Sequence, residues 1–192
     1  GRDGMALFDD TVAGYYGDHT DTNALLPTHG GTVKPTARYP EGAAAGVATD
    51  DRRTLLVGFE SLTDFDAPLA ASHLDAAGAP FDVDGVSISF PGDLRADAKV
   101  TRYAKLLDQD SEVAVEGRRV GARTALADRI KGHLDGHERV GFPAVLGDDH
   151  ARAVRAALED DLGAAVFEVP MGPPSLPGLR LEDRLFEALD AA

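Results

Sequence analysis

The stretch A-V-F-E-V-P-M-G-P-P-S-L-P-G-L-R-L, from Ala165 to Leu181, decides the fold class. Its first five residues form an apolar run that is typical of a buried strand. A turn rich in Pro and Gly follows, and then a helix that places Leu181, Leu185 and Leu189 on one stripe. The order strand, turn, amphipathic helix is the repeating unit of an α/β protein.

Two earlier segments have the same organisation. The apolar runs Thr54–Gly58 and Arg139–Val145 each lead through a polar turn into an amphipathic helix, and Gly85–Phe90 alternates like a further strand. Between them, residues 96–134 are expected to be mainly helical, with breaks near 109–111 and 117–121. The chain is therefore predicted to be α/β, with a mainly parallel sheet flanked by helices.

A short β-hairpin is predicted near the N-terminus. Ala24–Pro27 and Thr32–Tyr39 read as two strands around the turn His29-Gly30-Gly31, and the small residues of Glu41–Asp51 read as a loop. The residues from Gly1 to Tyr16 read as a helix already under way, and the last helix stops without a cap. We therefore expect a single α/β domain, residues 1–192, cut from the middle of a larger subunit.

The charge excludes several classes of function. The net charge is −14, and the acidic residues are spread along the whole chain, whereas lysine occurs only four times. This pattern favours adaptation to multimolar salt over an acidic block that docks a basic partner. No basic patch suits a nucleic acid, no apolar run suits a membrane span, and the absence of cysteine excludes thiolate chemistry.

The turns that follow the predicted strands are the expected place for a ligand. In a parallel sheet, the turns at 59–64, 146–149 and 171–175 would share the edge at the carboxyl ends of the strands. The hairpin adds Thr32, Lys34, Thr36 and Arg38, which could bind a phosphate or a carboxylate. The alternative is that strand alternation merely places both cations on an exposed face. Arg180 is expected to reach either a ligand or a structural carboxylate.

Other candidate sites are weak. His133 and His137 have helical spacing, but a glycine interrupts them and no third ligand is near, so no metal site is predicted. Ser175 reads as a helix N-cap followed by proline in the first turn, not as a nucleophile. The chain lacks G-x-G-x-x-G, a P-loop and H-E-x-x-H, so it carries no dinucleotide-binding motif of its own.

Four segments resemble one known family. T-H-G-G-T-V-K-P-T-A-R-Y-P (Thr28 to Pro40), L-V-G-F-E-S-L-T-D-F-D (Leu56 to Asp66), G-F-P-A-V-L-G-D-D (Gly141 to Asp149) and V-P-M-G-P-P-S-L-P-G-L-R-L (Val169 to Leu181) are similar to the B subunit of anaerobic glycerol-3-phosphate dehydrogenase from salt-loving archaea. The resemblance covers nearly the whole chain in the same order, and its last segment is the most distinctive.

The resemblance implies a flavoprotein that oxidises sn-glycerol 3-phosphate to dihydroxyacetone phosphate and passes electrons toward quinone. The cofactor would be FMN, or alternatively FAD, held mainly by parts of the subunit outside this chain. The partners would be the A subunit of the dehydrogenase, together with a membrane-anchoring C subunit. The location would then be cytoplasmic and membrane-associated without direct insertion. In this setting Lys34 and Arg38 would bind the substrate anion, and His29 would be the catalytic base.

One alternative remains open from the sequence. The chain could be a docking module that joins the flavin subunit to its partners and performs no chemistry. A stand-alone ligand-binding α/β protein is not expected, because it would require complete ends.

Overall fold

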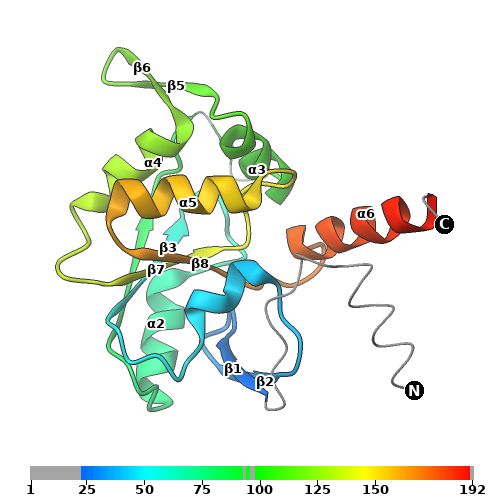
Figure 1. Ribbon diagram of the computed structural model, residues 1–192. Helices are drawn as coiled ribbons and strands as arrows, with labels where there is room; N and C mark the ends of the chain where they lie inside the picture. Colours follow the sequence, from blue (N-terminus) through cyan, green and yellow to red (C-terminus); the bar gives the residue numbers. More distant parts are fainter. Residues whose placement is uncertain (1–22, 93, 96–97, 191–192) are drawn as a thin grey trace.

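The computed structural model describes residues 23–92, 94–95 and 98–190 (Figure 1), so the helix predicted at Gly1–Tyr16 lies outside the described residues. The strands and helices follow in the order β1 (Ala24–Pro27), β2 (Val33–Thr36), the 3-10 helix η1 (Glu41–Gly46), β3 (Thr54–Phe59), α2 (Ala67–Ala76), β4 (Val83–Ile88), α3 (Val100–Asp108), β5 (Glu112–Val115), β6 (Arg118–Gly121), α4 (Ala122–Lys131), β7 (Arg139–Pro143), α5 (Ala151–Leu162), β8 (Ala165–Val169) and α6 (Leu176–Asp190).

The central sheet has four parallel strands in the order β4-β3-β7-β8. Thr54 pairs with Val83 on one side and with Arg139 on the other, and Arg139 in turn pairs with Ala165. The predicted α/β class with a mainly parallel sheet and an N-terminal hairpin is therefore confirmed. From β3 the chain first adds β4 on one side of the sheet and then returns to add β7 and β8 on the other side. The strand order therefore reverses between β3 and β7.

Helices cover both faces of this sheet (Figure 1). Every residue of β3 and of β7 is buried, because a parallel strand between two helical layers has no solvent face. Alternate residues of β3, such as Leu55 and Val57, pack in the larger core with α3, α4 and α5, whereas Leu56 packs in a second core with α2. The two cores fix the sheet between its helices.

The segment between α3 and α4 differs from the expectation. The predicted helical region, residues 96–134, is interrupted by the antiparallel hairpin β5–β6. Its turn residues Glu116 and Gly117 have φ angles of 48° and 79°, the backbone that a tight hairpin turn needs. The sequence signal for this hairpin was the pair Glu116-Gly117 between two short runs that contain the β-branched residues Val113, Val115 and Val120. From the sequence alone, these positions were interpreted only as breaks between helices.

The predicted loop at Glu41–Asp51 begins with η1, which packs on β8. A Cβ on Gly46 would overlap the ring of Phe167, and a Cβ on Gly42 would lie 2.6 Å from Oε2 of Glu168. The small residues of this segment therefore serve close packing on the sheet.

The last helix also differs from the expectation. The leucine spacing predicted a helix lying on the sheet, but Leu176 is its only buried residue, and Phe186 and Leu189 are 57% and 71% exposed. Figure 1 shows α6 extending away from the body of the molecule. Its predicted start is confirmed, since Oγ of Ser175 accepts a hydrogen bond from the N–H of Gly178 (3.3 Å). In the part of the chain that the structure describes, every helix is too short or too polar to cross a bilayer.

Candidate functional site

The three turns that were expected to hold a ligand do share one edge of the sheet. They follow β3, β7 and β8, which are parallel, so all three lie at the carboxyl ends of their strands. Three adjoining hollows run along this edge and share lining residues. The first, which we call the switch-point hollow, lies beyond β3, where the strand order reverses. The second, the α3 hollow, lies beside α3. The third, the arginine hollow, lies beyond β7 and β8.

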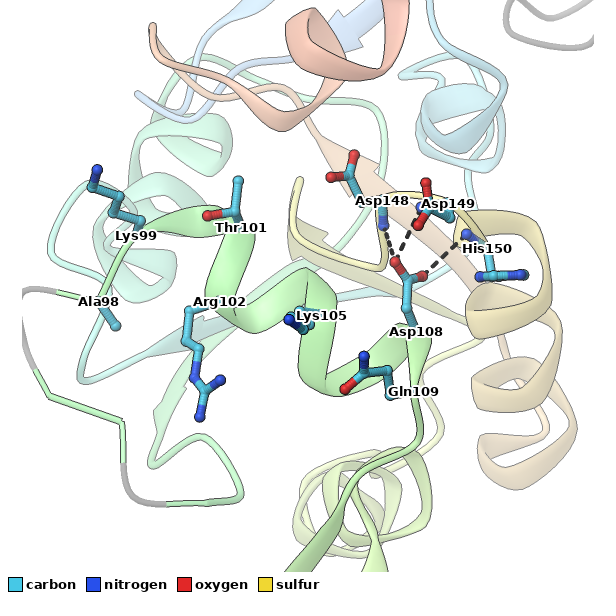
Figure 2. Close-up of a pocket in the computed structure, with 10 residues that line it drawn as sticks. All are labelled: Ala98, Lys99, Thr101, Arg102, Lys105, Asp108, Gln109, Asp148, Asp149 and His150. Atoms are coloured by element: carbon cyan, nitrogen blue, oxygen red, sulfur yellow. Dashed lines mark hydrogen bonds between the residues drawn. The ribbon is translucent and has the colours of Figure 1, made fainter. Parts of the chain in front are cut away.

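The α3 hollow has a volume of about 780 Å³ and lies between α3 and the turn that enters α5 (Figure 2). Lys99, Arg102 and Lys105 line it from α3, and Asp148 and Asp149 line it from the turn. Burial raises the pKa of Asp148. The hollow is therefore basic on one wall and acidic on the other.

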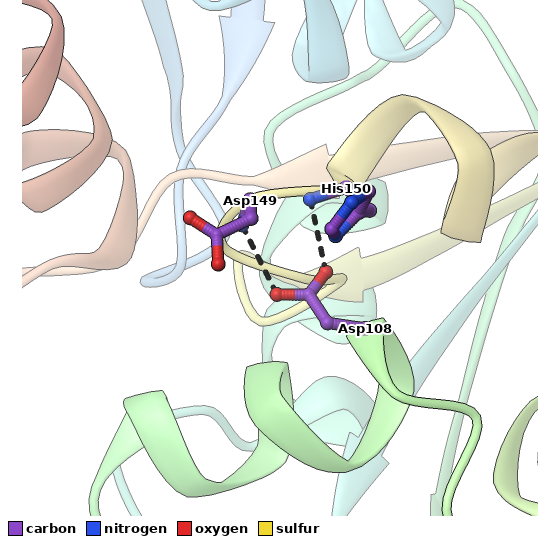
Figure 3. Close-up of side chains that lie close together, drawn as sticks. All are labelled: Asp108, Asp149 and His150. Atoms are coloured by element: carbon purple, nitrogen blue, oxygen red, sulfur yellow. Dashed lines mark hydrogen bonds between the residues drawn. The ribbon is translucent and has the colours of Figure 1, made fainter.

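Asp108, the last residue of α3, accepts hydrogen bonds from the turn that leads into α5 (Figure 3). Its Oδ2 accepts hydrogen bonds from the N–H groups of Asp148 (2.7 Å) and Asp149 (3.0 Å), and its Oδ1 accepts one from the N–H of His150 (3.1 Å). The residue that precedes α5, His150, makes no side-chain cap. Asp108 therefore satisfies the N–H group of the N-cap residue His150 and two N–H groups of the turn that precedes α5.

The same three side chains could suggest a metal centre. One ligand atom each from Asp108, Asp149 and His150 lies within 4.8 Å of the others. However, both carboxylate oxygens of Asp108 already accept backbone hydrogen bonds, and Asp149 and His150 are exposed. Helix capping accounts for this cluster without an ion.

Asp108→Ala is expected to lower the free energy of unfolding by about 1–2 kcal/mol, because the start of α5 loses its acceptor. Thermal unfolding in multimolar KCl, followed by circular dichroism, measures the change. Asp160→Ala, an exposed change on α5 itself, is the matched control and should cost less than about 0.5 kcal/mol. Equal costs for the two variants would contradict the capping role.

The arginine hollow, about 380 Å³, is rich in charge pairs. Nη1 of Arg180 lies 2.7 Å from Oε2 of Glu168, which is only 3% exposed, and Nε of Arg180 donates to the carbonyl of Gly147. Arg152 and Arg155 both approach Glu41, at 2.6 and 3.5 Å. These guanidinium groups tie η1, α5, β8 and α6 together, so the hollow is bounded by a network of internal ion pairs.

The structure places the predicted hairpin residues apart from Arg180. His29 and Lys34 are exposed, the hydroxyls of Thr28 and Thr32 hydrogen-bond each other at 2.8 Å, and the hydroxyl of Thr36 donates to the carbonyl of Lys34. Beyond the hairpin, Arg38 is half-buried. Pro40 and Glu41, not these hairpin residues, line the arginine hollow beside Arg180.

Two other histidines, His73 and His137, make structural contacts. Nδ1 of His73 lies 3.0 Å from the carbonyl of Gly30, so α2 holds the hairpin turn. Nε2 of the buried His137 lies 2.9 Å from Asp84. Neither of these two histidines lies at the carboxyl edge of the sheet.

Sequence reasoning selected the turns at 59–64 and 146–149, which line the first two hollows, but not the residues that line these hollows from α3. Lys99, Thr101 and Asp108 lie in or beside α3, which was predicted only as part of a long helical region. Ser61 belongs to a turn that was selected, but its hydrogen bond from the buried Tyr103 joins residues 42 positions apart. The available signal was the pair of lysines, Lys99 and Lys105, in a chain that has only four.

The described residues do not by themselves form a cradle for a flavin dinucleotide. The turn after β3 has no glycine between Phe59 and Asp66, and in the turn that leads into α5 the N–H groups of Asp148 and His150 bind the carboxylate of Asp108. A pyrophosphate needs a glycine-rich turn and open N–H groups at such a place.

Comparison with known proteins identifies the family to which the chain belongs. The model of a family described as "FAD binding domain" matches residues 1–191. Proteins of two Halobacterium salinarum strains, each named as a probable B subunit of anaerobic glycerol-3-phosphate dehydrogenase, are 66% identical over 191 residues, which is 100% of this chain and 45% of each relative. A Pectobacterium atrosepticum protein, named as the B subunit of the same dehydrogenase, is 29% identical over 134 residues, 68% of this chain and 29% of that protein.

The chain thus spans about half the length of the Halobacterium relatives that it matches. No solved structure matches it. The resemblance read from the four sequence segments is confirmed, and the family supports a flavin cofactor without distinguishing FMN from FAD. With a match over residues 1–191, this chain belongs to the FAD binding domain family.

Proposed function

We propose that this chain is part of a flavin-dependent dehydrogenase subunit that oxidises sn-glycerol 3-phosphate to dihydroxyacetone phosphate and passes the electrons to quinone. The single observation that carries the proposal is the 66% identity over the whole chain to proteins named as the B subunit of an anaerobic glycerol-3-phosphate dehydrogenase. The parallel sheet with its hollows along one edge supports a ligand-binding role, because ligands of open α/β sheets bind at that edge.

The flavin, FMN or alternatively FAD, is bound mainly by parts of the subunit outside this chain, and the chain alone is inactive. In support, the described residues lack a glycine-rich cradle and the sequence lacks G-x-G-x-x-G. The flavin supplies the oxidation, and this chain's residues position the substrate anion. The A and C subunits of the dehydrogenase are the proposed partners, and the second of them anchors a cytoplasmic assembly to the membrane.

The test compares two samples in multimolar KCl. The full-length subunit, purified with its partners, is expected to be yellow, to lose its flavin band when sn-glycerol 3-phosphate is added, and to form dihydroxyacetone phosphate. The enantiomer, sn-glycerol 1-phosphate, is the matched control and should leave the band unchanged. This chain alone, mixed with FMN or FAD, should show no shifted flavin band.

Each arm can fail separately. A full-length complex that keeps its flavin band with sn-glycerol 3-phosphate would contradict the activity. A shifted flavin band with this chain alone would contradict the proposed division of the cofactor site.

A docking domain without chemistry is the second candidate. The exposed apolar side chains of Phe186 and Leu189 on α6 favour it, as does the exposure of Lys34. Under this alternative, changes in the hollows would leave KM for the substrate unchanged. Replacing Phe186 and Leu189 with serine would instead reduce the recovery of partner subunits.

A further inference from the structure

The switch-point hollow has the position and the size of a small-ligand site. It has a volume of about 530 Å³ and lies at the carboxyl end of β3, where the strand order reverses. Its polar walls come from Ser61, Thr63 and Asp64 in the turn after β3, and from Lys99 and Thr101 at the start of α3. Pro174 and Leu179 close it from the side of α6.

Lys99 lines this hollow and, together with Arg102 and Lys105, the adjoining α3 hollow; these three cations differ from most others in the described part of the chain. Lys99, Arg102 and Lys105 are exposed, and no hydrogen bond or ion pair links their side chains to another described residue. Lys131, by contrast, lies 2.8 Å from Asp128. In a chain of net charge −14, three unpaired cations on one short helix indicate an anion that comes from outside the fold.

The hydroxyl groups complete the chemistry. The buried phenol of Tyr103 donates a hydrogen bond to Oγ of Ser61 (2.7 Å), so Ser61 keeps its own proton for another acceptor. Burial raises the pKa of Tyr103, so the phenol remains protonated and remains the donor at neutral pH. Thr63 and Thr101 are exposed at the mouth of the same hollow. Tyr103 thus orients one member of a set of hydroxyl donors.

We propose that the switch-point hollow binds the phosphate group of a small phosphorylated polyol, with Lys99 as its charge partner and Ser61, Thr63 and Thr101 as hydroxyl donors. That the polyol is sn-glycerol 3-phosphate rests on the proposed function. An ammonium group with several hydroxyl donors suits the oxygens of a phosphate, and a hollow of this size suits a three-carbon substrate. Lys99 lines both the switch-point and the α3 hollows, so it lies where the two meet.

The experiment uses the full-length complex in multimolar KCl. Lys99→Ala should raise KM for sn-glycerol 3-phosphate on the order of 10-fold or more, since it removes a charge-assisted contact. Thr63→Val, which removes one hydroxyl at nearly constant volume, should raise KM about 5-fold. Lys99→Arg should recover most of the loss. Lys131→Ala is the matched lysine control and should leave KM unchanged.

The competing prediction from the hairpin is tested in the same series. If Lys34→Ala with Arg38→Ala raises KM and Lys99→Ala does not, the phosphate binds at the hairpin and the proposal is wrong. Inorganic phosphate is the second probe: it should raise the melting temperature of the full-length subunit, and Lys99→Ala should abolish that shift. No shift in the unmodified subunit would also overturn the proposal.

These results separate the site from the activity. A phosphate shift that depends on Lys99, in a complex that does not oxidise sn-glycerol 3-phosphate, would support the site and overturn the proposed function. Oxidation with KM unaffected by Lys99→Ala would support the function and overturn the site.

Discussion

Arg139→Met is expected to lower the free energy of unfolding by about 3–5 kcal/mol. Arg139 opens β7 and is 0% exposed. Its Nη1 donates to the carbonyls of Ala45 (3.2 Å) and Val47 (3.0 Å), and its Nη2 donates to those of Asp50 (2.9 Å) and Arg52 (3.2 Å). One side chain thus supplies donors to the whole connection from η1 to β3.

Methionine restores much of the volume of Arg139 but none of its donors. Four carbonyls would lose a charged donor, and leaving such groups unsatisfied in a buried place is costly. Burial lowers the pKa of Arg139, yet an arginine starts so high that it stays charged at neutral pH. The guanidinium also lies over the ring of Phe81, with Cζ 4.9 Å from the centroid, and methionine lacks this charge–ring contact.

Denaturant unfolding in multimolar KCl, followed by circular dichroism, measures the loss. Arg118→Met is the control, because Arg118 is exposed on β6 and its side chain has no hydrogen bond to another described residue. It should change stability by less than about 0.5 kcal/mol. An Arg139→Met variant within about 1 kcal/mol of the unmodified protein would show that solvent replaces the guanidinium, contrary to our expectation.

Local patterns predicted β3, β7 and β8 well because each of these strands is a short apolar run. The strand at Ala165–Val169 has the predicted bounds, and the predicted runs at Thr54 and Arg139 begin where β3 and β7 begin. Burial on both faces makes such strands continuously apolar, so no long-range information was needed. The same local logic failed for α6, since a leucine stripe does not say which surface covers it.

The missed features depend on contacts between distant residues. Arg139 bonds carbonyls 87 to 94 positions away, and Asp108 caps a helix that begins more than 40 positions later. A charged residue at the start of an otherwise apolar strand was the available sign for Arg139. For the candidate site, the sequence placed the three strand-end turns at one edge of the sheet, as the structure does, but it could not place α3 beside the turn after β3, where Lys99 lines the switch-point hollow.

Arg180→Met is expected to lower the free energy of unfolding by about 3–4 kcal/mol, because it leaves the carboxylate of Glu168 buried without its counterion. The pair is bidentate: Nη1 lies 2.7 Å from Oε2, and Nη2 lies 2.9 Å from Oε1. Oε1 also accepts the N–H of Leu146 at 2.9 Å, and Glu168 and the Arg180 side chain are only 3% and 10% exposed. Each partner is therefore costly to remove alone.

A double variant separates the charge from the packing. Glu168→Gln in the Arg180→Met background removes the uncompensated charge and keeps an oxygen for the N–H of Leu146, so about 2 kcal/mol of the loss should return. Arg184→Met, one turn further along α6, is the control, because Arg184 is 59% exposed and approaches Glu187 at only 3.5 Å. If Arg180→Met costs no more than Arg184→Met, the ion pair does not hold the start of α6 against β8. Binding of a ligand, the other role that the sequence left open for Arg180, would then be the better explanation for its position in the arginine hollow.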